Sequence, residues 1–165
     1  MDLNNLSFRT EVKDPDVAIV RDMVSGTGFF NQEEIDIAVE LVEERLNKGV
    51  ASGYEFIFLE LNGKTIAYSC FGRIPLTKSS FDLYWIVTDT EYRNRGLGKI
   101  LLKETENDIL GKNGSAIYAE TSSREQYLPT RKFYENNNYT LKARFEDYYD
   151  QGDDLVFYVK RLTEL

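Results

Sequence analysis

Histidine is missing from this chain of 165 residues, and only one cysteine, Cys70, is present. Without histidine, any acid–base chemistry must use carboxylates, tyrosine, lysine, cysteine or water. A single cysteine cannot form an internal disulfide and gives no metal-binding pattern, so no metal cofactor is predicted. Because Cys70 lies in a strand-like run, we expect a small core residue rather than a nucleophile.

Long apolar runs are missing as well. No run approaches the roughly 18 residues that a membrane-spanning helix needs, so we predict no membrane association. The first ten residues do not show the charged and then apolar pattern of a signal peptide, and we therefore expect a cytoplasmic protein.

Positive charge is scarce: 20 lysines and arginines face 28 acidic residues, which gives a net charge of −8. Nucleic acid is therefore disfavoured as a partner, because phosphate binding needs a cationic face. An acidic field favours cationic substrates such as amines, although the same charge can serve solubility alone.

The remaining composition is that of a globular protein, and residues 1–165 are predicted to form a single domain. Apolar periodicity and turn residues predict strands and helices in alternation. Strands are expected at 6–12, 54–61, 64–72, 80–88, 114–121, 139–150 and 153–162. Helices are expected at 14–26, 31–49, 96–110 and 129–138, the first with Asp14 near its cap and the third with Leu97, Ile100, Leu101 and Ile109 on its apolar face.

Two glycines, Gly96 and Gly98, separate the strand at 80–88 from the helix that follows. N–H groups at a helix start have no partner within the helix, and glycine lets an anion approach them closely. Basic residues surround the turn, so it fits a phosphate cradle, although Gly-x-Gly also occurs in ordinary strand-to-helix turns. Neither the Walker motif nor the full Rossmann fingerprint is present, because Leu101 replaces the third glycine.

Residues 86–102, "IVTDTEYRNRGLGKILL", resemble motif A of the GNAT N-acetyltransferases, and the matching positions are Arg93, Gly96 and Gly98. Further along, "KFYENNNY" resembles the segment that usually reads aromatic-Tyr-Glu-x-x-Gly-Phe, with Asn138 in place of the glycine. The element order matches too, over about residues 8 to 162. The resemblance implies an α/β (α+β) fold with a mixed, mostly antiparallel sheet of about seven strands flanked by about four helices.

In that family, acetyl-CoA binds in a V-shaped opening between the fourth and fifth strands, so the resemblance implies acetyl-CoA as co-substrate. Its pantetheine arm would pair with backbone groups of Ile86, Val87 and Thr88. Tyr127 stands where many members have an asparagine, and the pantetheine contact there could come from Ser122, Ser123 or Tyr127. The pyrophosphate would accept hydrogen bonds from the N–H groups of the turn, flanked by Arg93 and Arg95: Asn94, Arg95, Gly96, Leu97, Gly98 and Lys99.

The implied reaction is direct attack of an amine on the thioester. Tyr134 matches the family tyrosine that protonates the departing thiolate; its other possible role is helix packing. Asp82 stands where the histone acetyltransferase branch has its catalytic glutamate, and Glu120 on the next strand is the second candidate for the base. A carboxylate in a semi-apolar cleft can accept a proton near neutral pH, yet either residue could also be structural.

The sequence does not identify the acceptor of the acetyl group. The resemblance implies a primary amine of a small molecule or peptide, and it leaves a homodimer open. An acidic and aromatic hairpin at 146–154 could bind a cationic amine, or it could be a solvated turn. Two other classes compete with the enzyme: a non-catalytic acyl-CoA-binding or sensing module, and an acidic protein-interaction domain without cofactor.

Overall fold

The structure, a computed structural model, describes residues 5–162. Their contacts divide them into two compact units, and we describe each unit by itself. Unit 1 comprises residues 5–72 and Trp85–Asn107, and unit 2 comprises Arg73–Tyr84 and residues 108–162.

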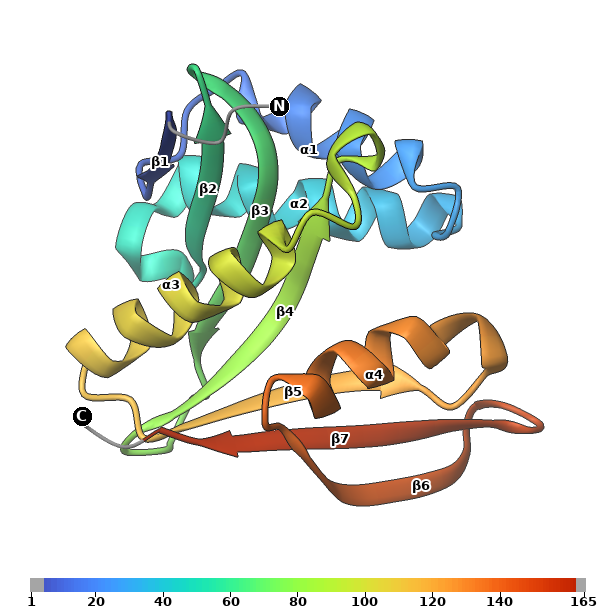
Figure 1. The fold of residues 1–165 in the computed structure, drawn as a ribbon. Coiled ribbons are helices and arrows are strands. Elements are labelled where there is room, and N and C mark those ends of the chain that lie inside the picture. The colour runs from blue at the N-terminus through green and yellow to red at the C-terminus, as the bar shows by residue number, and fades with distance from the viewer. Residues whose placement is uncertain (1–4, 163–165) are drawn as a thin grey trace. The chain divides into compact units, whose positions relative to one another are not determined.

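The strands and helices follow the order that the sequence predicts (Figure 1). Their hydrogen bonds form one seven-stranded sheet with the order β1-β2-β3-β4-β5-β7-β6, which confirms the predicted fold class. None of the helices within residues 5–162 is long and apolar enough to span a membrane. The elements are β1 (Leu6–Arg9), α1 (Asp16–Gly26), α2 (Gln32–Lys48), β2 (Glu55–Leu61), β3 (Lys64–Arg73), β4 (Ser80–Thr88), α3 (Leu97–Gly111), β5 (Ala116–Ser122), α4 (Leu128–Asn136), β6 (Thr140–Asp150) and β7 (Asp153–Arg161).

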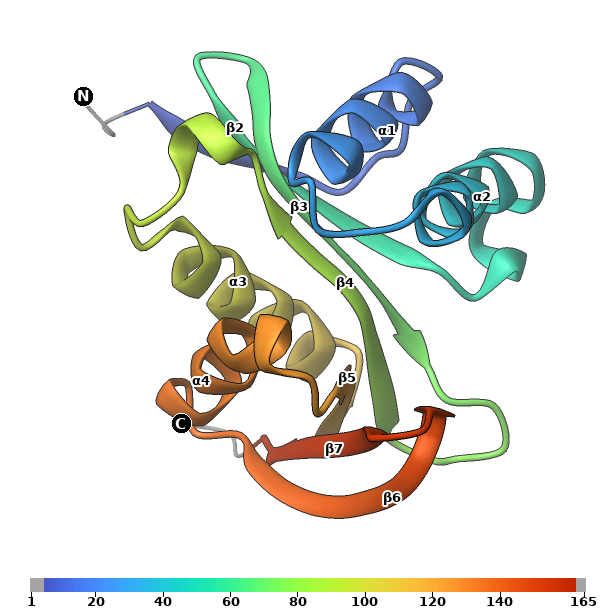
Figure 2. The same cartoon turned by 90° about the vertical axis from the view of Figure 1, so that its right-hand side faces the viewer.

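In unit 1, helices α1 and α2 cover one face of β2 and β3, and α3 covers the other (Figure 2). On the α3 side, the Ser69 hydroxyl lies 2.8 Å from that of Thr105, which joins β3 to the helix. On the α1/α2 side lies an apolar core that includes Cys70, in agreement with its expected role. The buried members of this core are Val20, Met23, Val24, Ile35, Ala38, Val39, Val42, Phe56, Phe58, Tyr68, Cys70 and Val87.

Local sequence signals set the element ends in unit 1. Asn31 caps α2, because its side chain accepts a hydrogen bond from the Glu34 amide while the Glu34 carboxylate accepts one from the Asn31 amide. The β2–β3 hairpin turns at Asn62 and Gly63, whose φ angles of 51° and 80° are left-handed. Asp14 does not cap α1: Pro15 stands at the N-cap position without a side-chain cap bond.

One position of the predicted α3 face is wrong. Leu97, Leu101 and Ile109 are buried as expected, but Ile100 is 38% exposed. The rotation of about 100° per residue in a helix places Ile100 at the margin of the apolar stripe.

Unit 2 is built on β5, which pairs in parallel with β4 and antiparallel with β7. The parallel pairing joins Ser80–Asp82 to residues 116–118, and β4 continues beyond it to Thr88. Helix α4 covers one face of β5 and β7: the ring of Tyr134 stacks on that of Tyr158 with 5.8 Å between centroids. Figure 1 shows α4 beside these strands.

Strand β6 is the last strand of the sheet and pairs with β7 alone. Its side chains are mostly exposed, including Leu141 and Phe145. The register with β7 is irregular at two places, between Leu141 and Ala143 and between Phe145 and Asp150. These irregularities are β-bulges or openings of the ladder, which bend a strand and leave residues without a cross-strand partner.

Candidate active site

The turn before α3 has the backbone that an anion cradle needs. Asn94 and Gly96 have left-handed φ angles of 59° and 77°. A Cβ atom built on Gly96 would have no heavy atom within 4 Å, so the space beside this residue is open. The first ladder bond of the helix runs from the Ile100 amide to the Gly96 carbonyl at 3.2 Å. The amides that precede Ile100 at the start of α3 therefore have no partner within the helix.

The three basic residues of this turn, Arg93, Arg95 and Lys99, are exposed. One Arg95 nitrogen donates to the Glu91 carbonyl at 3.3 Å, and the guanidinium lies 6.0 Å from the centre of the Tyr92 ring. Arg95 thus lies over the preceding 3₁₀ turn. These cations place positive charge next to the positive end of the α3 dipole.

The end of β4 contributes backbone rather than side chains. Val87 belongs to the apolar core of unit 1, whereas Ile86 and Thr88 are half-buried. Because side chains alternate along a strand, Val87 faces α1 and α2 while its neighbours face the α3 side. The Val87 side chain is therefore not available to a ligand.

Unit 2 brings the two predicted bases together. Asp82 lies opposite Tyr118 in the β4–β5 register, and Glu120 is two residues further along β5. Asp82 is half-buried and Glu120 is exposed. Burial, followed by the charge of Glu120, raises the pKa of Asp82 to about 6, and burial raises the pKa of Glu120. A carboxyl group with such a pKa can exchange a proton near neutral pH.

Tyr134 has a buried ring on α4, held against the rings of Phe133, Tyr139 and Tyr158. Burial raises the pKa of Tyr134 well above its usual value, so the phenol keeps its proton at neutral pH. Within residues 5–162 no group hydrogen-bonds to the Tyr134 hydroxyl. The Tyr134 ring therefore does pack against other side chains, which was its alternative role, while its hydroxyl makes no hydrogen bond that would hold the fold.

Tyr127 ends a 3₁₀ turn and stands at the N-cap position of α4. Arg131 fixes the loop that leads to it, because its guanidinium donates to the carbonyls of Ser122 and Arg124 at 2.8 and 2.7 Å. These two hydrogen bonds hold the β5–α4 connection against the end of β5.

The acidic hairpin uses several of its carboxylates internally. Asp154 accepts hydrogen bonds from Arg144 and from the Asp147 amide, and Asp147 accepts one from the Gly152 amide at 2.7 Å. Asp153 binds Ser122 and forms an ion pair with Arg124 at 2.9 Å. Asp153 and Asp154 are buried, so this turn is neither fully solvated nor a set of unpaired charges.

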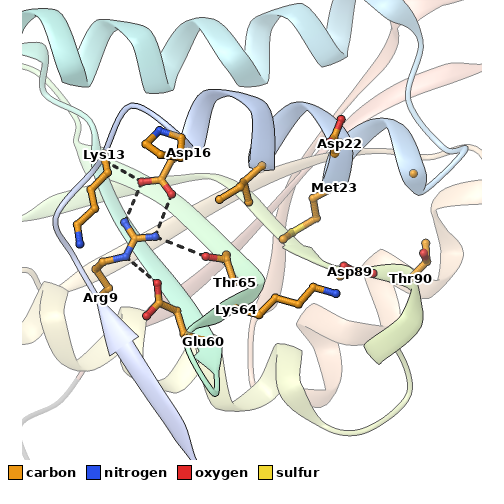
Figure 3. Close-up of a pocket in the computed structure, with 14 residues that line it drawn as sticks. Arg9, Lys13, Asp16, Asp22, Met23, Glu60, Lys64, Thr65, Asp89 and Thr90 are labelled. Atoms are coloured by element: carbon orange, nitrogen blue, oxygen red, sulfur yellow. Dashed lines mark hydrogen bonds and ion pairs between the residues drawn. The ribbon is translucent and has the colours of Figure 1, made fainter.

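A second charged cluster, in unit 1, had no signal in the sequence (Figure 3). The Arg9 guanidinium binds both Asp16 oxygens at 2.8 and 2.9 Å and the Glu60 carboxylate at 2.7 Å. Asp16 also accepts the Lys13 amide at 2.8 Å. These residues line a pocket of about 520 Å³ whose other walls come from α1, the β2–β3 hairpin and Asp89. The network satisfies its own charges and needs no ligand for that purpose.

Comparison with known proteins places these features in a family. A sequence model described as an acetyltransferase (GNAT) domain matches residues 52–141. A crystal structure of a GNAT-family protein from Desulfovibrio desulfuricans is 39% identical, with a TM-score of 0.93, and the match covers 94% of this chain and 98% of that chain. No curated protein matches the sequence significantly.

More distant structures share the fold. The protein yncA from Salmonella typhimurium, solved with its cofactor acetyl-CoA, is 17% identical with a TM-score of 0.74, covering 98% of this chain and 96% of that chain. The aminoglycoside 6'-N-acetyltransferase from Enterococcus faecium is 15% identical with a TM-score of 0.74, covering 97% and 98%. By the matching family model and the closely similar structure together, the chain belongs to the GNAT family of acetyltransferases.

Proposed function

We propose that this protein is an N-acetyltransferase that moves an acetyl group from acetyl-CoA to a primary amine of a small molecule or peptide. The observation that carries the proposal is the start of α3. Gly96 combines a left-handed φ of 77° with open space around its Cα, directly before helix amides that have no intrahelical partner. This combination suits close approach of a diphosphate, and the GNAT family uses acetyl-CoA.

The residues of the turn fit acetyl-CoA chemically. The N–H groups of the α3 start would bind the pyrophosphate, with the side chains of Arg93 and Arg95 beside it. Main-chain groups of Ile86, Val87 and Thr88 would pair with the pantetheine arm, and Tyr127 is the further residue expected to contact it. Bound acetyl-CoA supplies the activated acetyl group as a thioester. These are the cofactor residues expected from the family resemblance, and their roles remain part of the proposal.

The protein's own groups would then move two protons. Asp82 or Glu120 would take a proton from the acceptor ammonium group and leave its nitrogen lone pair free to attack. Tyr134 would donate its hydroxyl proton to the departing sulfur, a role that its raised pKa permits because the phenol remains protonated. The amide N–H near Val87 or Thr88 would stabilise negative charge on the acetyl oxygen.

The first test is binding of acetyl-CoA by calorimetry, with Gly96→Ala as the variant. The added Cβ enters the open space and strains a left-handed residue, so we expect at least tenfold weaker binding. Gly53→Ala is the matched control, because Gly53 also has a left-handed φ, 79°, and no heavy atom near its Cβ position. Absence of binding heat and of a thermal shift in the unaltered protein would overturn the cradle and the proposed function with it.

The second test separates an enzyme from an acyl-CoA sensor. A panel of primary amines, including aminoglycosides, polyamines and peptides, is screened by thiol release. Tyr134→Phe should lower kcat by about a hundredfold or more while CoA affinity stays the same. Release of thiol at the same rate from wild type and variant would contradict the role of Tyr134. No release with any amine, despite CoA binding, would favour the sensing module.

A further inference from the structure

Asp82 and Glu120 are placed on the same face of unit 2 by the β4–β5 pairing. Asp82 is the register partner of Tyr118, and Glu120 follows Tyr118 by two residues, so all three side chains share one face. Parallel strands lie about 4.8 Å apart and rise about 3.3 Å per residue, which puts the two carboxylate Cα atoms roughly 8 Å apart. The opposite face, with Tyr158, is the one that α4 covers.

No cation neutralises this pair. Within residues 5–162, neither Asp82 nor Glu120 makes a hydrogen bond or an ion pair with another residue. Arg124, in the loop that follows β5, is bound to Asp153 at 2.9 Å. Tyr118 of β5, the register partner of Asp82, lies on the same face as the pair. The charge of Glu120 also acts on Tyr149 of β6, whose other charged or titratable neighbours are Tyr148, Asp153 and Tyr127.

The two carboxylates differ in exposure, and this difference decides which one takes up a proton. Glu120 is exposed to water, which stabilises its charged form, while Asp82 is half-buried between strands. When two like charges approach, the proton goes to the group whose charge is less well solvated. The pKa of Asp82 rises to about 6 for these two reasons, burial first and the charge of Glu120 second.

We propose that Glu120 acts on the transfer reaction through Asp82: its charge, held across the strand pairing, makes Asp82 the carboxylate that accepts the proton of the acceptor amine. The inference rests on the proposed function and resolves which carboxylate is the base. In the step itself, an N–H bond of the ammonium group breaks, an O–H bond forms on Asp82, and the electron pair stays on nitrogen. Glu120 is then a positioning residue and not a second base.

The test compares the pH dependence of kcat/KM in Glu120→Gln and Asp82→Asn with that of wild type. The acid limb of wild type should have its midpoint near the Asp82 pKa of about 6. Glu120→Gln should move this midpoint to lower pH by about half a unit, and its plateau rate should fall by much less than that of Asp82→Asn. Asp82→Asn should lower the plateau rate by about a hundredfold, and the acid limb should be missing from its profile.

Glu43→Gln is the matched control, since it removes one exposed carboxylate from α2 and makes the same change in net charge. Its profile should follow wild type. An unshifted acid limb in Glu120→Gln would overturn the inference, and so would a loss as large as that of Asp82→Asn, because Glu120 would then be a base itself.

Titration of the Asp82 carboxyl carbon by NMR, in wild type and in Glu120→Gln, gives a readout that does not require turnover. A lower midpoint in the variant is the expected result. If wild type transfers acetyl groups but the NMR midpoint is unchanged, this inference fails while the proposed function stands. If wild type binds acetyl-CoA and acetylates no amine, the proposed function fails, whatever the titration shows.

Discussion

Two groups of carboxylates in this protein differ in whether the fold gives them a cationic partner. In unit 1, Asp16 is 1% exposed and accepts hydrogen bonds from both terminal nitrogens of the Arg9 guanidinium, while Glu60 accepts one from its Nε. In unit 2, Asp82 and Glu120 lie on one sheet face with no cation bound to them. Both carboxylates of the first group are paired with Arg9, and Asp16 is almost completely buried, whereas neither carboxylate of the second group has a cationic partner among the described residues.

The difference separates charges that hold the fold from charges that are available for chemistry. A buried carboxylate without a partner costs several kcal/mol, so the fold must supply one when the group is structural. A half-buried carboxylate without a partner keeps a raised pKa and can exchange a proton with a ligand. The contrast supports the proposed role of Asp82 and Glu120 and identifies the Arg9 network as structural.

The largest expected effect comes from breaking the paired group. Arg9→Met keeps the aliphatic stem but leaves Asp16 buried without its cation, which should lower the free energy of unfolding by about 3–5 kcal/mol. Urea unfolding at neutral pH measures this change. Arg21→Met is the control, because Arg21 and Asp36 form an exposed pair at 2.9 Å that should contribute less than about 1 kcal/mol. Equal losses of unfolding free energy in the two variants would show that the buried pair stabilises the fold no more than the exposed pair does.

Asp82→Asn tests the unpaired group through stability rather than rate. The fold raises the pKa of Asp82 from 3.8 to about 6, so the folded state holds this proton more tightly than the unfolded chain does. Ionised Asp82 therefore lowers stability; the penalty is absent below about pH 4 and complete above about pH 6. We expect Asp82→Asn to raise Tm near pH 7.5 and to leave Tm unchanged near pH 4. A lower Tm at both values would show that Asp82 is structural.

Arg144→Gln sharpens the comparison within unit 2, where paired carboxylates also occur. Hydrogen bonds from the Asp147 amide and then from Arg144 hold the pKa of Asp154 below its usual value. That stability is present above the unfolded pKa of about 3.8 and is lost as the pH falls through the lower folded value. Arg144→Gln should lower Tm at neutral pH by less than Arg9→Met does, and the deficit should shrink in acid. Melting curves across the acidic range measure it.

Tyr68→Phe should give the smallest effect. The Tyr68 hydroxyl is the one side-chain polar atom that is buried without a hydrogen bond among the described residues. Its removal costs no hydrogen bond and relieves a buried polar group, so stability should stay within about 0.5 kcal/mol of wild type or rise slightly. Phe56→Leu, in a ring that stacks with Tyr68, is the comparison and should cost more. A marked loss in Tyr68→Phe would reveal a partner for this hydroxyl.

Most of the fold could be predicted from the sequence because its signals are local. The Asn62-Gly63 turn, the Asn31 cap and the proline near the start of α4 each act over a few residues. The same is true of Asn138, whose left-handed φ of 67° lets it replace the usual glycine. The sequence did not give the exact start of α1, since Pro15 stands at the N-cap position without a side-chain cap bond and the helix begins at Asp16.

The site residues were predicted from short motifs, but the surroundings of their side chains could not be predicted from the sequence. Gly96 and Tyr134 stand in short motifs, so sequence spacing is enough to nominate them. Arg9 meets Glu60 across 51 residues, and Ser122 meets Asp153 across 31. No local period marks such pairs, because they form only when strands distant in the chain become neighbours. The burial and the pKa of a side chain depend on such long-range contacts, and they could therefore not be predicted from the sequence.

The irregular outer strand has a consequence for how the protein behaves at high concentration. An incoming strand needs a continuous row of N–H and C=O groups along the sheet edge to which it adds. The breaks in register at Leu141–Ala143 and at Phe145–Asp150 interrupt that row along β6. Although Leu141 and Phe145 are exposed, β6 is thereby a poor template for fibrous self-association, and the sheet can end in water without a covering helix.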